Sequence, residues 1–335
     1  MIKGKNDCRT ILYREALNEA LREEMRRDST VFLMGVSIGE RGGSYHVTTK
    51  LIDEFGPKRV IDTPIAEASV TGVGVGAGLA GMRPVVEINF IDFTLLVMDQ
   101  LVNQAAKYMF ITGGTKRVPL VVRTQGGVGE CLASQHSQSL EALLYHIPGL
   151  KIAVPSTPYD AKGLLKTAIR CDDPVVFIEH KMLYATDGYV PEEDYTIEFG
   201  AGDVKRSGSG ITLVAWSNMV PRSLAAAEKC AAEGIDVEVL DPRTLVPLDA
   251  GLIIGSARKT GRVLIVQEAV RRGGVASDIA SIVQEQAFDS LKVPVKILAG
   301  TNSPIPFNRH LEQACIPGED DIVRTIRSMH YTSWH

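Results

Sequence analysis

The sequence lacks the features that mark several large classes of protein. Its five cysteines, Cys8, Cys131, Cys171, Cys230 and Cys315, are odd in number and widely spaced, and none forms a CxxC pair. This pattern indicates neither a zinc knot nor a disulfide framework, and it is typical of the reducing cytoplasm. The net charge is −4 and no basic block is present, which argues against nucleic acid as a partner.

Long hydrophobic runs are also missing. Residues 68–82 are uncharged, but they are rich in glycine and fall short of the roughly 20 residues that a membrane span needs. Charged residues interrupt the N-terminal 30 residues, which excludes a signal peptide, and apolar residues between 12 and 25 instead mark one face of an amphipathic helix. We therefore expect a soluble, cytoplasmic protein with no membrane partner.

Self-contained catalytic motifs are absent as well. There is no GxSxG elbow, P-loop or HExxH, and the histidines do not fall at metal-ligand spacing. Gly76, Gly78 and Gly81 match GxGxxG, but that fingerprint needs a strand ending directly before it. Residues 67–75 look helical, so we expect these glycines inside or at the end of a closely packed helix. A nicotinamide-dependent dehydrogenase that uses these glycines remains a weaker alternative.

What the sequence does contain is a regular alternation of strands and helices. Short runs rich in Val and Ile are separated by helical patterns, which predicts an α/β fold with mostly parallel sheets. The strand candidates are residues 30–38, 59–65, 83–90, 118–125, 150–156 and 173–181, and the helix candidates include 93–110 and 157–170. Thr157 and Pro158 supply a cap and a first-turn proline for the second of these helices.

The alternation is interrupted once. Residues 182–209 are acidic, turn-rich and aperiodic, and strands and helices resume after them. We therefore predict two three-layer α/β domains, at 8–190 and 207–330, with a linker at 191–206.

Four blocks of sequence resemble one family. They are IDTPIAEASVTGVGVGAGLAGMRPVVEINFIDF, MDQLVNQAAKYMFITGG, QHSQSLEALLYHIPGLKIAVPSTPYDAKGLLKTAIRCDDPVVFIEH and DPRTLVPLD. Together they are similar to the β subunit of the thiamin-diphosphate-dependent decarboxylating component of 2-oxo acid (pyruvate or branched-chain) and acetoin dehydrogenase complexes. The resemblance implies a transketolase-like pyrimidine-binding domain followed by a transketolase C-terminal-type domain. It also implies an oxidoreductase that cleaves its substrate and transfers the acyl group reductively to a lipoyl group.

The resemblance assigns roles to residues around the first block. Glu67 matches the glutamate that hydrogen-bonds the aminopyrimidine ring of thiamin and exchanges a proton with it. Such a carboxyl needs shielding from water, which Ile65, Ala66, Ala68 and Val70 could provide. Without the resemblance, Glu67 would be a first-turn acid stabilised by the helix dipole, by about 0.3–1 kcal/mol. Phe93 matches the aromatic residue that stacks on the same ring.

Two positions in this region depart from the family pattern. Leu96 stands in the cofactor pocket where pyruvate-specific relatives often carry glutamine, and Asn89 stands where they often carry methionine. We expect the details of the pocket to differ accordingly.

Two further sites are implied by the resemblance. His136, in QHSQ, matches the histidine that assists decarboxylation and acyl transfer, although a polar loop of this kind could equally be an ordinary cap. Some relatives hold a structural potassium ion through backbone carbonyls. The matching positions are Leu120, Ala168, Ile169, Cys171 and Asp173, with Cys171 in place of the commoner aspartate.

The absence of one motif becomes informative when the sequence is compared with this family. Thiamin diphosphate is anchored through Mg²⁺, usually by a GDG motif, and the sequence contains no GDG. The family carries that motif on a separate α subunit. The resemblance therefore implies a heterotetramer of two α and two β chains that feeds a lipoyl-bearing acyltransferase core. A non-catalytic assembly subunit of the same fold remains an alternative. Several blocks favour acetoin as substrate, while pyruvate and branched-chain 2-oxo acids stay open.

Overall fold

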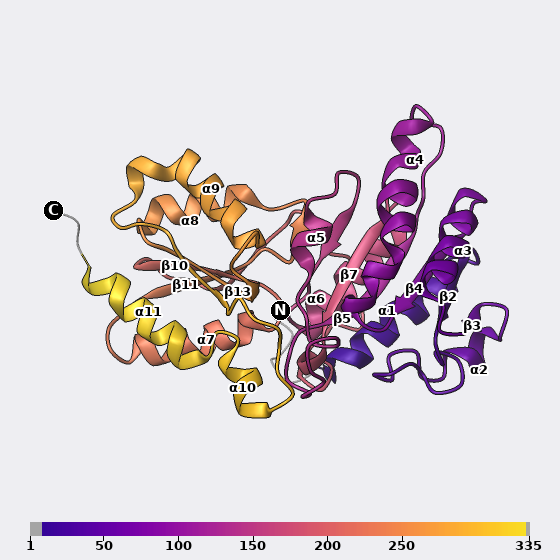
Figure 1. Ribbon diagram of the computed structural model, residues 1–335, viewed down its shortest axis with the longest axis horizontal. Coiled ribbons are helices and arrows are strands. Elements are labelled where there is room, and N and C mark those ends of the chain that lie inside the picture. Colours follow the sequence, from indigo (N-terminus) through magenta and orange to yellow (C-terminus); the bar gives the residue numbers. More distant parts are fainter. Residues whose placement is uncertain (1–8, 333–335) are drawn as a thin grey trace, which may run out of the picture. The chain divides into compact units, whose positions relative to one another are not determined.

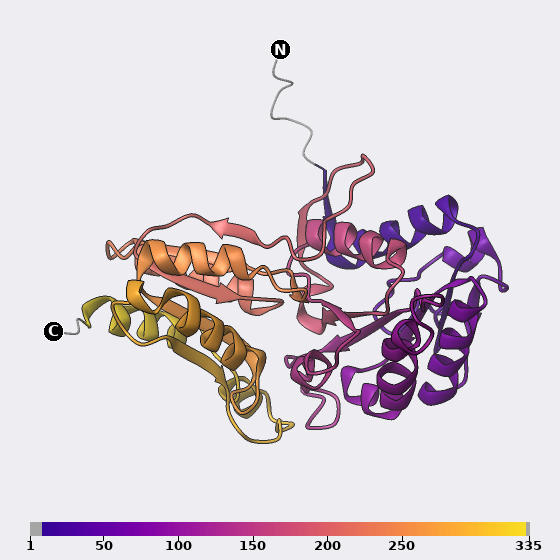
Figure 2. The same cartoon turned by 90° about the horizontal axis from the view of Figure 1, so that it is seen from above.

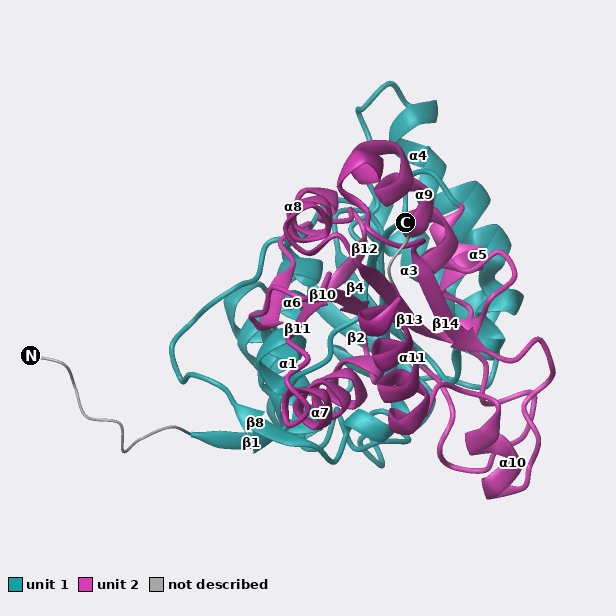
Figure 3. Ribbon diagram, turned by 90° about the vertical axis from the view of Figure 1, so that its left-hand side faces the viewer, with its two compact units in different colours: residues 1–125, 147–199 teal, residues 126–146, 200–335 magenta. Residues whose placement is uncertain are grey.

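The computed structural model describes residues 9–332, and the chain forms two compact units (Figure 3). Unit 1 comprises the chain up to Gln125 together with Ile147–Phe199, and unit 2 comprises Gly126–His146 and the chain from Gly200 onward. The change from unit 1 to unit 2 after Phe199 lies within the expected linker, 191–206. Cys8, where the expected first domain begins, lies outside the described residues.

One segment groups differently from the expected division at 8–190. Gly126–His146 belongs to unit 2 because its backbone is bound by side chains of that unit. The Val128 N–H donates to Glu268 Oε1 at 2.7 Å, and the Cys131 N–H donates to Glu312 Oε1 at 3.2 Å. Sequence patterning follows apolar periodicity along the chain, so it does not register such tertiary partners.

The main sheet of unit 1 is built from parallel pairs. Its strands lie in the order β6-β7-β5-β4-β2-β3, and the pairs β2–β3, β2–β4, β4–β5 and β6–β7 are parallel. Each expected strand is found, although shortened. The strands are β2 Val31–Gly35, β3 Val60–Asp62, β4 Arg83–Ile88, β5 Val121–Gly126, β6 Lys151–Ala153 and β7 Val175–His180.

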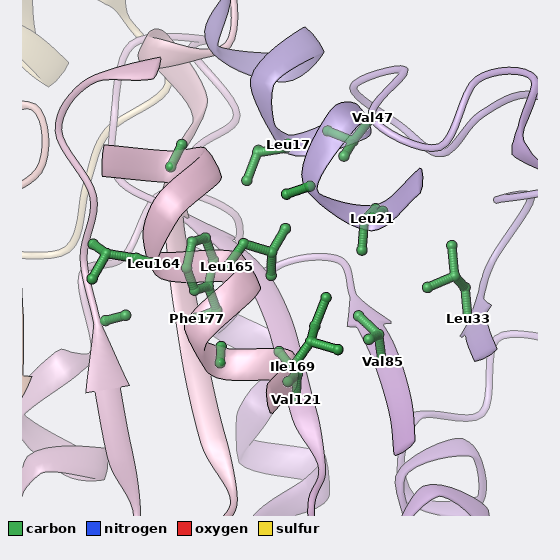
Figure 4. Packing of buried hydrophobic residues seen from close by; sticks show 14 of the residues in the cluster. Leu17, Leu21, Leu33, Val47, Val85, Val121, Leu164, Leu165, Ile169 and Phe177 are labelled. Carbon is green, nitrogen blue, oxygen red and sulfur yellow. The ribbon is translucent and has the colours of Figure 1, made fainter. Parts of the chain in front are cut away.

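Helices cover both faces of this sheet, which gives the expected three layers (Figures 1 and 2). One face carries α1 (Tyr13–Arg27) and α6 (Pro158–Arg170). Figure 4 shows Leu17 and Leu21 of α1, Leu165 of α6 and Val121 of the sheet, which are all buried in one apolar cluster. The expected cap of α6 is present, because Thr157 Oγ1 accepts from the Asp160 N–H at 3.1 Å.

The other face carries α3 and the segment that follows β4. Helix α3 spans Glu67–Leu79. The expected single helix at 93–110 is wrong in its type: the chain forms a 3₁₀ helix, then a π-helix and only then an α-helix. These are η1 (Ile91–Val97), η2 (Asp99–Ala105) and α4 (Ala106–Ile111). All three helix types bury apolar side chains every three to five residues, so the sequence pattern does not separate them.

Unit 2 is a second three-layer unit. Its sheet has the order β14-β13-β10-β11-β9, parallel except for the antiparallel pair β11–β9. Helices α7 and α11 lie on one face and α8 and α9 on the other (Figure 1). The bounds are β9 Asp203–Arg206, β10 Ile211–Ala215, α7 Met219–Ala231, β11 Val237–Asp241, α8 Ala250–Thr260, β13 Val263–Val270, α9 Val275–Ala287, β14 Lys296–Gly300 and α11 Glu319–Tyr331.

Short elements complete the two units. In unit 1 they are β1 Thr10–Leu12, α2 Leu51–Phe55, η3 Lys181–Leu183 and β8 Asp187–Tyr189, with β1 and β8 paired antiparallel. In unit 2 they are α5 Glu141–Tyr145, β12 Thr244–Val246, η4 Phe288–Ser290 and α10 Arg309–Ala314. Among the described helices, none combines the length and the apolar character that crossing a bilayer requires.

Candidate active site

Glu67 is the first residue of α3, at the edge of the sheet where the parallel strands end. Strand β3 ends at Asp62, and four residues connect it to the helix. The Asp62 carboxylate accepts from the backbone N–H groups of Gly39 at 2.7 Å and Glu40 at 3.0 Å, which ties a neighbouring loop to this edge. Glu67 itself is half-buried, and its carboxyl has no hydrogen-bond or ion-pair partner within the described residues.

The apolar shield expected around Glu67 is not formed by its neighbours in the sequence. Ile65 is 78% exposed, Ala68 is exposed and Ala66 is half-buried, so only Val70 of the four is buried. Ile65 and Ala66 precede the helix, and Ala68 lies on an exposed face of α3 while Val70 lies on a buried one. Within this chain, the carboxyl is open to water on one side.

The segment η1 places the two other expected cofactor residues beside α3. It packs directly against α3 and carries Phe93, which is half-buried, and Leu96, which is exposed. The structure therefore brings Glu67, Phe93 and Leu96 to neighbouring elements of unit 1. His136 belongs to unit 2.

The glycines of α3 do not form a dinucleotide-binding turn, and those on its inner face, Gly74 and Gly78, are explained by close packing. Gly76 and Gly78 lie within the helix, well after its start at Glu67. A Cβ on Gly78 would lie 3.3 Å from Val118 Cγ1, so this face sits close to the sheet. A dinucleotide fingerprint needs its glycines at the turn that opens the helix. The nicotinamide-dependent alternative is therefore wrong.

Several buried polar groups near Glu67 lack partners within the described residues. They are the hydroxyls of Thr63, Thr71 and Thr124 and the amide oxygen of Gln100. Buried polar atoms are nearly always hydrogen-bonded, so a group of them at one edge of a sheet indicates that something else binds there. An aminopyrimidine ring carries two ring nitrogens and an amino group. The carboxyl of Glu67 can hydrogen-bond such a ring and the aromatic ring of Phe93 can stack on it, so these two residues have the chemistry that the ring requires.

A buried ion network lies on the opposite face of the same strands. Arg123, on β5, is 1% exposed and pairs with Glu87 of β4 at 2.7 Å and with Glu179 of β7 at 2.6 Å. The Tyr184 hydroxyl donates to Glu179 at 2.5 Å. Burial raises the pKa of Glu179, although Arg123 opposes the shift, and burial raises the pKa of Tyr184.

This network was missed by sequence reasoning. Its signal was a charged residue among the apolar residues of each of three strands: Glu87 in RPVVEI, Arg123 in VVRTQG and Glu179 in VVFIEH. Charges in strands buried on both faces must be paired, so three such positions in adjacent strands predict a shared cluster.

His136 lies in a strained polar loop of unit 2. It is half-buried, and its backbone N–H donates to Ala133 O at 3.4 Å. Cys131 and Ala133 both have positive φ, at 57° and 62°, which is uncommon for residues other than glycine. The following residues, including Gln135 and Ser137, line a cleft of about 560 Å³ in the same unit. Non-glycine residues in this conformation often cluster at functional sites.

The five positions matched to a potassium site meet around the end of α6. There the guanidinium of Arg83 already donates to the carbonyl oxygens of Ile169 and Cys171, each at 3.0 Å. The Val175 N–H donates to Leu120 O at 2.8 Å, and the Cys171 N–H donates to Ala168 O at 3.3 Å. Asp173 pairs with Arg117 and Lys151.

The donor set of this segment fits a monovalent cation only in part. A carbonyl oxygen has two lone pairs, so each of the bonded carbonyls can accept a second partner. The positive charge of Arg83, however, already lies against two of them. No group of three or more His, Cys, Asp or Glu side chains within residues 9–332 could hold a metal ion.

Comparison with protein families gives two matches that together cover most of the chain. Residues 9–186 match the transketolase pyrimidine binding domain, and residues 200–322 match the transketolase C-terminal domain. Both matches agree with the two domain types implied by the sequence resemblance.

Three curated proteins illustrate the similarity to whole chains. The chain is 44% identical to the pyruvate dehydrogenase E1 component subunit beta of Rickettsia felis, over 96% of this chain and 99% of that protein. It is 43% identical to the 2-oxoisovalerate dehydrogenase subunit beta of Bacillus subtilis, over 95% and 98%. It is 44% identical to the acetoin:2,6-dichlorophenolindophenol oxidoreductase subunit beta of Bacillus subtilis, over 94% and 96%.

One solved structure supports the fold. A split-gene transketolase, described as an inactive β4 tetramer, aligns with a TM-score of 0.79 at 23% identity, covering 97% of this chain and 99% of that one. At this identity the likeness shows the transketolase-like two-domain α/β fold alone.

Proposed function

This chain belongs to the family of β subunits of pyruvate, 2-oxoisovalerate and acetoin dehydrogenases, and we propose that it supplies half of a thiamin-diphosphate site that a partner α subunit completes. Its relatives are oxidoreductase subunits. The observation that carries the proposal is the edge of unit 1, where Glu67 opens α3 and unpartnered buried polar groups lie on α3, on η2 beside it and on β5.

The residues of this edge suit recognition of an aminopyrimidine. When bound, thiamin diphosphate would supply a carbon nucleophile that attacks the substrate carbonyl. In this chain, Glu67 would hydrogen-bond a ring nitrogen and hold and return its proton. Phe93 would stack on the ring face. Leu96 would make an apolar contact where a glutamine at the same position would make a polar one. The N-terminus of α3 also stabilises the charged form of a first-turn carboxylate.

We propose that His136 exchanges protons during decarboxylation or C–C cleavage and during reductive acyl transfer to a lipoyl group. Imidazole can both donate and accept a proton near neutral pH. The support within this chain is the loop around it, where two non-glycine residues adopt positive φ beside a polar cleft of unit 2. To test the alternative of an ordinary cap, His136 is replaced, and the rates of decarboxylation and of acyl transfer are measured as separate steps.

A partner α subunit is proposed because unit 1 exposes apolar side chains near Glu67. The exposed large residues there belong to α3 and its approach, to η1 and to α4. They are Ile65, Val73, Leu95, Leu96, Met109, Phe110 and Ile111. Segment η1 packs against α3, and η2 packs against α3, η1 and α4. Extended apolar surface of this kind marks protein interfaces. Because this sequence contains no GDG motif, we propose that the partner holds most of the contacts to the diphosphate and Mg²⁺, in a tetramer of two α and two β chains.

The remaining parts of the proposal concern substrate, acceptor and location. We propose to test acetoin, pyruvate and branched-chain 2-oxo acids side by side, because relatives named for all three are about equally similar. Acetoin comes first because several blocks of the sequence favour it. A lipoyl-bearing acyltransferase core in the cytoplasm would receive the acyl group. A potassium ion at Leu120, Ala168, Ile169, Cys171 and Asp173 would be an added structural element, and it would have to share carbonyls with Arg83.

Titration of thiamin diphosphate with Mg²⁺ tests the central claim. We expect no binding by the purified chain alone and clear binding after co-expression with its α partner. Glu67→Gln should weaken that binding severely and abolish turnover while leaving the assembly intact. Tight binding by the chain alone would contradict a shared site. An intact assembly that binds no cofactor would instead favour the non-catalytic assembly subunit.

A further inference from the structure

Thr71 and Thr124 carry two of the unpartnered buried hydroxyls, and the proposed function names no individual partner for either. Both side chains are 0% exposed, and neither hydroxyl has a hydrogen-bond partner within the described residues. Thr71 lies on α3 one turn after Glu67, and Thr124 lies on β5. Leaving a buried hydroxyl unpaired costs roughly 1–3 kcal/mol, so a partner is expected under working conditions.

The packing of α3 on the sheet places both hydroxyls near Glu67. A Cβ on Gly78 would lie 3.3 Å from Val118, and a Cβ on Gly74, one turn earlier, would lie 3.1 Å from Leu120. The helix therefore runs antiparallel to β5. Glu67 lies seven residues before Gly74, which is about 10 Å along the helix axis. A strand covers the same distance in about three residues. The first turn of α3 thus lies level with residues 123–124.

The side-chain directions agree with this placement. Val121 belongs to the cluster beneath α1 and α6, whereas Leu120 contacts α3. Because side chains alternate along a strand, Thr124 faces α3 as Leu120 does. On the helix, Glu67, Thr71 and Gly74 follow the spacing of four and three residues that defines one face. Glu67, Thr71 and Thr124 therefore line the same helix–strand seam.

We propose that Thr71 and Thr124 are positioning residues that donate hydrogen bonds to the Glu67 carboxyl when a partner subunit and cofactor cover this edge. In the chain alone, water reaches the half-buried carboxyl. Once covered, a carboxylate needs protein donors in place of water. One oxygen would face the cofactor ring and the other would take the two hydroxyls, which would hold the carboxyl at a fixed angle. This inference rests on the proposed thiamin-diphosphate site.

Few other charged groups face this seam. On η1, which packs against α3, Asp92 is buried, and on η2 Asp99 is exposed and accepts from Asn103 Nδ2 at 2.7 Å. Asp62, before the helix, accepts from two backbone N–H groups. The side chains of β4 and β5 that face α3, among them Val86, Leu120 and Thr124, are uncharged, because Glu87 and Arg123 point to the other face. The hydroxyls of Thr71 and Thr124 are thus donors on this helix–strand seam that a substitution can remove without changing charge.

The test uses the assembled α–β enzyme with Thr71→Val, Thr124→Val and the double variant. The readout is the number of protons taken up when thiamin diphosphate with Mg²⁺ binds. It is obtained by calorimetry in two buffers, repeated over a range of pH. Hydroxyl donors favour the ionised carboxylate, so their removal lets it protonate at higher pH. We expect the midpoint of proton uptake, and the acidic limb of kcat, to move up by about one pH unit in the double variant.

Two sets of variants control for a structural effect. Thr71→Ser and Thr124→Ser keep the hydroxyls and should return the midpoint to its original pH. Ser223→Ala removes a hydroxyl on α7 that is also buried without a partner, but in unit 2, and should leave the midpoint unchanged. The valine variants should unfold at no lower temperature than the original chain, because each removes an unpaired buried group.

The outcomes separate this inference from the function on which it rests. If the original assembly binds no thiamin diphosphate, the proposed function fails. If it binds and the double variant keeps the original midpoint, only the positioning role of Thr71 and Thr124 is overturned. If a valine variant fails to assemble, the serine variants provide the test. They keep the hydroxyls, so a displaced midpoint of proton uptake in them would contradict a role for the hydroxyls.

Discussion

At the scale of single residues, Arg123 is the side chain on which the most buried charge depends. It pairs with two carboxylates, Glu87 and Glu179, and all three side chains are buried. Arg123→Ala would leave both carboxylates without their counter-charge. We expect it to lower the free energy of unfolding by about 3–5 kcal/mol, since breaking a buried pair from one side exposes the full desolvation cost of the other. Urea unfolding followed by circular dichroism measures this loss.

Arg117 provides the matched control for Arg123. It also pairs with a carboxylate, Asp173 at 2.9 Å, but its side chain is 44% exposed. Arg117→Ala should therefore change the free energy of unfolding by less than about 1 kcal/mol. Equal effects of the two substitutions would contradict the view that burial, and not the ion pair as such, sets the cost.

The sequence identified some of these residues and not others, for physical reasons. The role proposed for Glu67 came from the sequence, because a long motif carries the resemblance that assigns it. Arg123 could have been found, because a lone charge in a buried strand needs a partner. Thr71 and Thr124 could not, since threonine is ordinary in both helices and strands, and only burial without a partner distinguishes these two. The exposure of Ile65 was hidden as well, because this residue lies in the connection before α3, where no apolar periodicity predicts burial.

At the scale of elements, the glycines of α3 divide into two faces with opposite expected behaviour. A Cβ on Gly74 would lie 3.0 Å from Val86 and 3.1 Å from Leu120, whereas a Cβ on Gly76 would meet nothing within 4 Å. Gly74→Ala should destabilise the chain by about 1–3 kcal/mol through overpacking. Gly76→Ala should stabilise it by up to about 1 kcal/mol, because alanine is the better helix former. Thermal unfolding of the two variants gives the comparison.

The same pair tests how α3 is used in the assembly. If the open face that carries Gly76 packs against another subunit, Gly76→Ala should stabilise the isolated chain and yet weaken association with the partner. Equal stabilisation of the chain and of the assembly would show that this face stays uncovered.

Helices α1 and α6 are joined by a network of ion pairs that should respond to acid. A hydrogen bond from Lys166 lowers the pKa of Asp194. Burial opposes ionisation of Glu19, but hydrogen bonds from Arg9 and Lys162 outweigh it and lower its pKa. Lys162 and Lys166 are themselves buried.

The sign of the pH effect follows from these lowered pKa values. A carboxyl with a lowered pKa in the folded state stabilises the fold above its ordinary value, 3.8 for Asp194 and 4.5 for Glu19, and loses that contribution as pH falls. We expect the free energy of unfolding to fall below about pH 4.5. Lys166→Met should make that fall shallower. Urea titrations between pH 7 and pH 3.5 measure both slopes, and identical slopes would refute the assignment.

Element type was predictable where a buried face alone decides it. The strands of unit 1 are continuous apolar runs, and α6 carries its own cap at Thr157, so both were found. Residues 91–111 were not, because the change from η1 through η2 to α4 depends on how the backbone fits beside α3. The grouping of Gly126–His146 with unit 2 was missed for a similar reason, since its anchors are distant carboxylates.

At the scale of the whole molecule, the exposed apolar surface of unit 1 is the feature that a complete enzyme must cover. Phe110, at the end of α4, is 88% exposed, and Ile111 beside it is also exposed. Figure 1 shows α4 extending beyond the strands of unit 1. Large aromatic side chains that become buried at interfaces often carry at least 2 kcal/mol of binding energy. Phe110→Ser should therefore weaken assembly with the α partner by about 30-fold or more.

Phe288 allows a control of the same chemistry in unit 2. It lies on η4 and is 62% exposed. Phe288→Ser should leave the affinity between the subunits unchanged if the partner covers the α4 surface of unit 1. Sedimentation velocity of the mixed chains over a range of concentrations measures both affinities. Neither substitution should lower the unfolding temperature of the isolated chain, because both side chains already lie in solvent there. A larger loss for Phe288→Ser would move the interface to unit 2. Since the proposed cofactor site at Glu67 lies in unit 1, that result would also remove the reason for sharing it with the partner.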